Sequence, residues 1–245
     1  RARMSAYTPR HPLKREIVAT HVVNSMVNRV GATFVHRICE MSGAAALQVV
    51  RAYLLAREVF GVVELWRQVE ALDNRVADAL QAEMLIHEGW LTSRATTWFL
   101  RSRRLAEPMA ATIERLRPAV DALGARLAPQ AQRSALAAGW AAAGVPATLA
   151  ARIASAEGLL DALDIAEAAE ATRRPFDDVC AAHARVGERL GLARLRTQID
   201  GLASDSYWQG RAKAALGDDL GALHRALAEQ VLAGGDGSGD ALVAR

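Results

Sequence analysis

The fold is decided by the stretch VADALQAEMLIHEGWLTSRATTWFLRSR, residues 76–103. Its apolar positions recur every three or four residues, which is the spacing of one face of an α-helix. These positions are Val76, Leu80, Met84, His87, Leu91, Ala95 and Trp98. A helix of this length spans about 40 Å. The pattern therefore predicts one long central helix against which the rest of the chain packs.

The composition predicts the same fold class for the whole chain. About a fifth of the residues are alanine, the strongest helix former, and aromatic residues make up only 5%. The apolar share of 51% and the charged share of 23% are those of a globular protein, which excludes collagen and simple disorder. A chain of 245 residues buries enough surface to fold without disulfides or metal. We therefore expect an all-α protein, an irregular multi-helix bundle of about ten helices.

Composition and the positions of glycine and proline residues divide the chain into four parts. Residues 1–11 are polar, carry a proline and read as a connector from an upstream catalytic domain. Residues 12–105 hold most of the β-branched and tryptophan residues and form a first helical subdomain. Residues 106–233 are rich in alanine and arginine and form a second one. Residues 234–245 are rich in glycine and read as a flexible tail.

The charge and the cysteines bear on partners and compartment. The net charge is only +3 and acids occur in most helical segments, so a nucleic-acid partner is not expected. Cys39 and Cys180 lie far apart and suggest no disulfide framework, which favours a reducing compartment. No apolar run reaches membrane-spanning length and the first residues lack the apolar core of a signal peptide. We expect a cytoplasmic protein with no membrane partner, and read the chain, which does not begin with methionine, as part of a longer one.

Catalytic signatures are missing from the sequence. It has no dinucleotide-binding G-x-G-x-x-G between a strand and a helix, no P-loop, no G-x-S-x-G and no H-E-x-x-H. His87 precedes Glu88 but lacks the second histidine of a zinc motif, so a packed histidine is favoured. Cys180 and His183 share a helix face, where a buried structural cysteine is favoured over an activated thiolate. We assign no catalytic, cofactor-binding or metal-ligating residue to this segment.

Two groups of residues are candidates for contacts with a partner. In the first predicted helix, residues 13–30, a polar stripe of Thr20, Asn24 and Asn28 runs between apolar positions. A helix that is apolar around such a stripe is expected to be buried on several sides, with its amides bonded to a neighbouring helix or to a missing domain. The second group lies at the end of the long helix, where cations also favour the helix dipole. It consists of Arg94, Arg101 and Arg104, with Arg103 beside them, as a candidate anion or partner contact.

Motifs found in order along the chain resemble the C-terminal region of the large bacterial NAD-specific glutamate dehydrogenases. They cover about residues 7–232 and are densest before residue 105. They are HPLKREIVAT at 11–20, Asn24, Val27 to Arg29, Gly31, Thr33 to Val35, RAY at 51–53, AREVF at 56–60, Leu65-Trp66, EALDN at 70–74, TWFLR at 97–101, LDIAE at 163–167, TRRP at 172–175 and GERLGL at 187–192.

The resemblance implies a multidomain parent that converts L-glutamate, NAD and water to 2-oxoglutarate, ammonia and NADH. It implies that NAD and the catalytic residues lie upstream, that this segment is non-catalytic, and that it serves core packing, assembly of a homo-oligomer or regulation. The alternatives are a stand-alone helical protein-interaction module and, less favoured, a basic helical module that binds nucleic acid through the Arg94–Arg104 cluster.

Overall fold

The structure is a computed structural model that describes residues 11–203 and 205–234. Within these residues the chain forms helices and no strand, which confirms the all-α prediction. The elements are somewhat more numerous than predicted, because several predicted stretches break into short helices. They are α2 (Lys14–Val30), α3 (Phe34–Ser42), α4 (Ala46–Val59), α5 (Val62–Glu70), α6 (Asp78–Arg101), the 3-10 turn η1 (Arg103–Leu105), α7 (Met109–Gln132), α8 (Ala135–Ala142), α9 (Ala147–Ala154), α10 (Ala156–Leu159), α11 (Asp161–Thr172), α12 (Phe176–Arg189), α13 (Leu192–Asp200) and α14 (Tyr207–Ala233).

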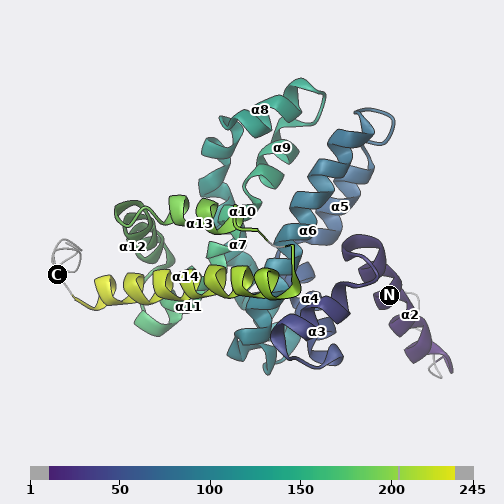
Figure 1. Cartoon of the computed structure of the whole chain (residues 1–245), viewed down its shortest axis with the longest axis horizontal. Coiled ribbons are helices and arrows are strands. Elements are labelled where there is room, and N and C mark those ends of the chain that lie inside the picture. Colours follow the sequence, from purple (N-terminus) through teal and green to yellow (C-terminus); the bar gives the residue numbers. More distant parts are fainter. Residues whose placement is uncertain (1–10, 204, 235–245) are drawn as a thin grey trace.

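Helix α6 is the long central helix that the sequence predicts. It begins and ends two residues inside the predicted range and packs against α4 and α5 (Figure 1). Met84, Leu91 and Phe99, spaced by about two turns, are at most 1% exposed. The apolar face is therefore buried, as its period predicts. Its residues belong to two of the three core clusters.

The largest core cluster lies between α4, α6, α7, α11 and α12. It contains Leu55 and Phe99 from one side of the predicted boundary at residue 105, and Leu116 and Leu163 from the other. The two predicted subdomains thus share one core, and a division at residue 105 stays a prediction.

A second cluster fills the space between α5, α6, α8 and α9. Trp140 of α8 is 3% exposed and anchors this cluster. His87 is half-buried, and its ring meets Trp140 edge-on with centroids 5.4 Å apart. The aromatic contact agrees with the packed role favoured for this histidine.

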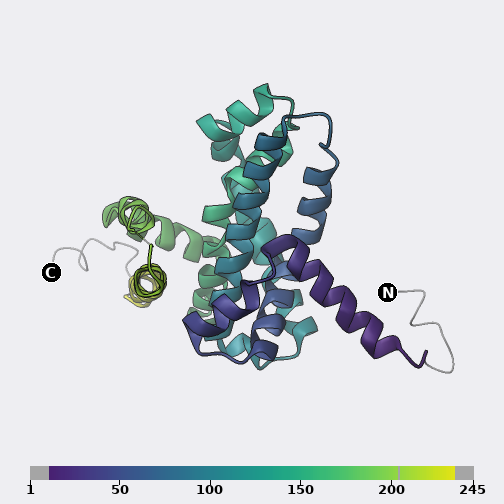
Figure 2. The ribbon, with the colours of Figure 1, turned by 45° about the vertical axis from the view of Figure 1, so that its right-hand side comes forward.

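The third cluster holds one end of α2 against α3 and α4. Met26 is the only residue of α2 that is buried, against Phe34, Ile38 and Tyr53 of the same cluster. Figure 2 shows the rest of α2 projecting away from the other helices. Within the described chain α2 is not buried on several sides, because only its last turns reach a neighbouring helix. The expected contact with a missing domain stays a prediction.

Helix α14 turns an unexpected face inward. Its apolar period suggests that Trp208, Leu216 and Leu223 face the core, yet they are 71%, 47% and 52% exposed. The buried residues are instead His224 and Ala228. Glycines let α14 approach its neighbours closely on this side, because the His224 ring packs against Gly187 of α12 and Gly221 lies beside Asp164 of α11.

No single helix in residues 11–203 and 205–234 has both the length and the apolar character needed to cross a bilayer. Only α3 and α4 taken together, bent by 109° at the break between them, pass that test by length and composition. The predicted tail beyond Gly234 and all of the predicted connector except His11 lie outside the described residues.

Candidate functional site

The exposed face of α2 carries the first group of predicted contact residues. Thr20, Asn24 and Asn28 all lie on the exposed side, together with Ile17 and Val27, which are 43% and 38% exposed. The spacings of three and four residues place these five side chains on one face. Within the described part of the chain, the side-chain amides of Asn24 and Asn28 have no hydrogen-bond partner. The face therefore offers both polar and apolar contacts. We call this set the α2 face.

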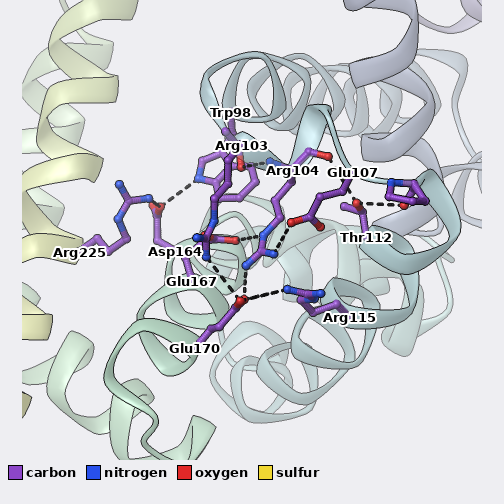
Figure 3. Close-up of polar contacts among 12 residues, drawn as sticks. Trp98, Arg103, Arg104, Glu107, Thr112, Arg115, Asp164, Glu167, Glu170 and Arg225 are labelled. Atoms are coloured by element: carbon purple, nitrogen blue, oxygen red, sulfur yellow. Dashed lines mark hydrogen bonds and ion pairs between the residues drawn. The ribbon is translucent and has the colours of Figure 1, made fainter.

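Arg104 of the second group is the centre of a separate network of ion pairs, which we call the polar hub. This side chain is 1% exposed and pairs with Glu107 at 2.7 Å and with Glu167 and Glu170 of α11 (Figure 3). Arg115 of α7 reaches Glu170 at 3.0 Å from the other side. The hub therefore ties η1 and α7 to α11.

Electrostatics in the hub follow from this pairing. Burial acts to lower the pKa of Arg104, but its hydrogen bonds and the charges of its carboxylate partners raise that pKa above its usual range. Desolvation acts to raise the pKa of Glu170, and the hydrogen bonds from Arg104 and Arg115 outweigh it and lower the pKa. Arg104 is thus a permanent buried cation, and the carboxylate of Glu170 stays ionised beside it.

A second polar link joins α6, α11 and α14. The Trp98 indole nitrogen donates to Asp164 at 2.9 Å, and Arg225 of α14 pairs with the same oxygen at 3.0 Å (Figure 3). Burial raises the pKa of Asp164 to about 6, against the hydrogen bond from Trp98 and the charge of Arg225. Asp164 is therefore an acid of this region that titrates close to neutral pH.

Titration of Asp164 is expected to show in the fluorescence of Trp98. Its raised pKa means that ionisation in the folded chain costs stability as pH rises from 3.8 to about 6. We expect an emission change with a midpoint near pH 6, absent from Asp164→Asn and from Trp98→Phe. A transition that persists in Asp164→Asn would assign the titration to another group.

Arg94 and Arg101 both meet an acid of α14. Their guanidinium groups pair with Asp218, Arg94 at 3.9 Å. Gly217 makes this approach feasible, because a Cβ there would lie 2.8 Å from a guanidinium nitrogen of Arg94. The structure brings these two arginines together and separates Arg104 from them. Their role as an anion or partner contact stays a prediction, although in the chain alone all three are already paired with carboxylates.

A cleft of about 840 Å³ lies between α6, α11, α13 and α14. Arginine and carboxylate side chains alternate on its walls and pair across it, as Arg196 does with Asp161 at 2.9 Å. Because the arginines pair with carboxylates of the walls, the described residues of the cleft give no concentration of positive charge for an anion. The sequence could not indicate this cleft, since its walls come from segments far apart in the chain.

Asp161, His183 and His224 are the one group whose ligand atoms lie close enough to suggest a metal in the described residues, within 4.8 Å of one another. The His224 Nε2 lies 2.7 Å from the His183 carbonyl oxygen and donates to it, while Arg196 lies 3.4 Å from Nδ1. The two rings stack at 3.4 Å, so their in-plane lone pairs do not converge on one ion. The cluster fits a packing role rather than metal ligation.

The Cys180 and His183 pair does not form an activated thiolate. Cys180 is 8% exposed, and burial raises the pKa of its thiol. Burial also lowers the pKa of His183 to about 4, so this histidine is neutral and gives the thiolate no positive charge. Both residues pack α12 against its neighbours.

Comparison with known proteins places the chain. A family model described as "Glutamate dehydrogenase, C-terminal" matches residues 1–244. The NAD-specific glutamate dehydrogenase of Pseudomonas aeruginosa is 37% identical over 93% of this chain and 14% of that protein. The enzymes of the same name from Halomonas elongata and Mycobacterium tuberculosis are 36% and 31% identical over 91% and 92% of the chain, again 14% of each protein.

The chain thus spans a small part of the length of these relatives, and the resemblance read from its motifs is confirmed. Because the family model covers nearly all of its residues, the chain belongs to the family of C-terminal regions of the large NAD-specific glutamate dehydrogenases.

Proposed function

We propose that this chain is the helical, non-catalytic C-terminal part of an NAD-specific glutamate dehydrogenase. The parent enzyme would convert L-glutamate, NAD and water to 2-oxoglutarate, ammonia and NADH, with NAD bound upstream of this segment. The names of the relatives support the activity. The absence of any dinucleotide-binding or catalytic motif from the sequence supports the placement of the chemistry elsewhere.

The α2 face is the surface through which this part would attach to the upstream catalytic domain. It stands at the beginning of the described chain and projects from the bundle (Figure 2), with exposed apolar side chains flanking two amides. Apolar groups bury well in an interface, and amides within it fix its register by hydrogen bonds. Assembly into a homo-oligomer in the cytoplasm completes the proposal, and the two cysteines, both free in the structure, fit a reducing compartment.

The attachment is tested on the complete gene product with Ile17→Asp and Val27→Asp together. Charges placed in an apolar interface cost several kcal/mol, so we expect at least an approximately tenfold loss of glutamate-dependent NAD reduction and faster proteolysis of α2. The control is Ile86→Asp, which changes a side chain that is 71% exposed on α6. Equal behaviour of the double variant and the control would contradict docking through α2, and a gene product without NAD reduction would contradict the parent activity.

A further inference from the structure

Three side chains near the base of α2 carry buried polar atoms that lack a well-formed hydrogen bond. Glu88 of α6 is 2% exposed, and neither of its carboxyl oxygens has a hydrogen-bond partner in the described chain. The hydroxyl of Tyr53 on α4 and the Nε of Arg29 on α2 are also buried and lack a hydrogen bond of good geometry, although Ser25 and Arg29 lie close enough to that hydroxyl to lower its pKa. A buried polar group that lacks a partner is costly, and three from different helices at one junction call for an explanation.

Arg29 is the common member of this group. Its guanidinium carbon lies 5.4 Å from the centre of the Trp66 ring on α5, and one of its terminal nitrogens bonds Ser25 of its own helix. Its charge acts on both Tyr53 and Glu88, and it is the strongest influence that lowers the pKa of Glu88. Yet neither carboxyl oxygen of Glu88 bonds Arg29 in the structure, so the charge of Arg29 acts on this buried acid without a direct ion pair.

Arg29 is the cation that acts most strongly on Glu88. The charged groups that act on it from other helices are Arg29, Glu70 of α5, which disfavours ionisation, and Arg152 of α9. Arg57 of α4 acts on Tyr53 and is itself paired with Glu58 at 2.6 Å. Burial is the main reason that the pKa of Glu88 is raised to about 8.

Few contacts hold helix α2 to the other helices, so its position can change slightly. Met26 is its only buried residue, and Gly31, with φ of 86°, ends it and links it to α3. We propose that Arg29 and Glu88 form a latch, which closes into a buried ion pair when the α2 face is engaged by the upstream part of the parent chain. This inference rests on the docking of α2 proposed above and adds its regulation.

The latch links the docking of α2 to pH. Closing the latch pairs the Glu88 carboxylate with the Arg29 cation and therefore lowers the pKa of Glu88. Ionisation of Glu88 thus favours the closed latch. Docking therefore strengthens as pH rises toward about 8 and weakens below it. If the pKa of Glu88 differs by about one unit between docked and undocked α2, the docking equilibrium changes about tenfold across this pH range.

The test is hydrogen exchange of residues 14–30 in the complete gene product, corrected for the intrinsic pH dependence of exchange. Between about pH 6 and about pH 9 we expect protection of α2 to rise about tenfold in the wild type. Glu88→Gln and Arg29→Gln, which remove the pair from opposite sides, should each abolish this rise. The control Glu83→Gln, which alters an exposed acid of the same helix as Glu88, should keep it.

The two proposals fail in different ways. If α2 is protected in the wild type but equally at both pH values, or if Glu88→Gln keeps the rise, the latch is wrong and docking stands. If α2 of the wild type exchanges as fast as α2 of the Ile17→Asp, Val27→Asp variant at every pH, docking is absent and the latch falls with it.

Discussion

The variant Arg104→Met is expected to lower the free energy of unfolding of the chain by about 3–5 kcal/mol. Methionine keeps most of the apolar stem, so the packing around position 104 changes little. The change removes the cation that Glu107, Glu167 and Glu170 share and leaves these carboxylates, two of them partly buried, without their central partner. Breaking a buried ion pair from one side is costly because the remaining charge stays desolvated.

Urea unfolding followed by circular dichroism measures this effect. The matched control is Arg115→Met, which removes an arginine of α7 that also contacts Glu170 but is 44% exposed. An exposed pair contributes little, so the control should lose no more than about 1 kcal/mol. Similar losses in the two variants would mean that the hub does not depend on its buried cation.

The variant Glu88→Gln is expected to do the opposite and stabilise the chain at neutral pH. The pKa of Glu88 is raised from 4.5 to about 8, so the folded chain binds a proton that the unfolded chain releases. The wild type therefore loses stability as pH rises from 4.5 to about 8, by about 3 kcal/mol at about pH 7. Glutamine is neutral in both states and does not carry this cost.

The pH dependence identifies the cause of the gain. Glu88→Gln should exceed the wild type in stability near neutral pH and match it below pH 4.5, as measured by urea unfolding at both pH values. The exposed Glu83→Gln should stay within about 0.5 kcal/mol of the wild type throughout. An equal gain in stability at both pH values would mean that a change in packing, and not the loss of an ionisable group, causes the stabilisation.

Much of the secondary structure followed from local sequence. The period of three and four residues located α6 to within two residues at each end, because its apolar face is buried along its length. Gly31, Gly43 and Gly61 mark helix ends, and each has the positive φ that disfavours other residues. The motifs spread over the chain also carried the family, which the comparisons confirm.

The candidate sites depended on contacts between distant segments. Arg104 was predicted as a candidate contact for an anion or a partner, but the carboxylates that pair with it, Glu167 and Glu170, lie 63 and 66 residues further along the chain. Glu88 drew attention only as a neighbour of His87. Its importance comes from its burial and from the charges of α2, α5 and α9 that act on it, which no local pattern reveals.

The sequence by itself determined that this protein is a set of helices and where the long helix runs, because helix formation depends on neighbours three and four residues apart. Its motifs also determined the family to which the chain belongs. The tertiary structure alone decided which faces are buried. Helix α14 turns His224 and Ala228 inward and leaves Trp208 exposed, and α2 leaves Ile17 and Val27 exposed. A period shows that a helix has distinct faces, but the close fit of neighbouring helices selects the face that packs.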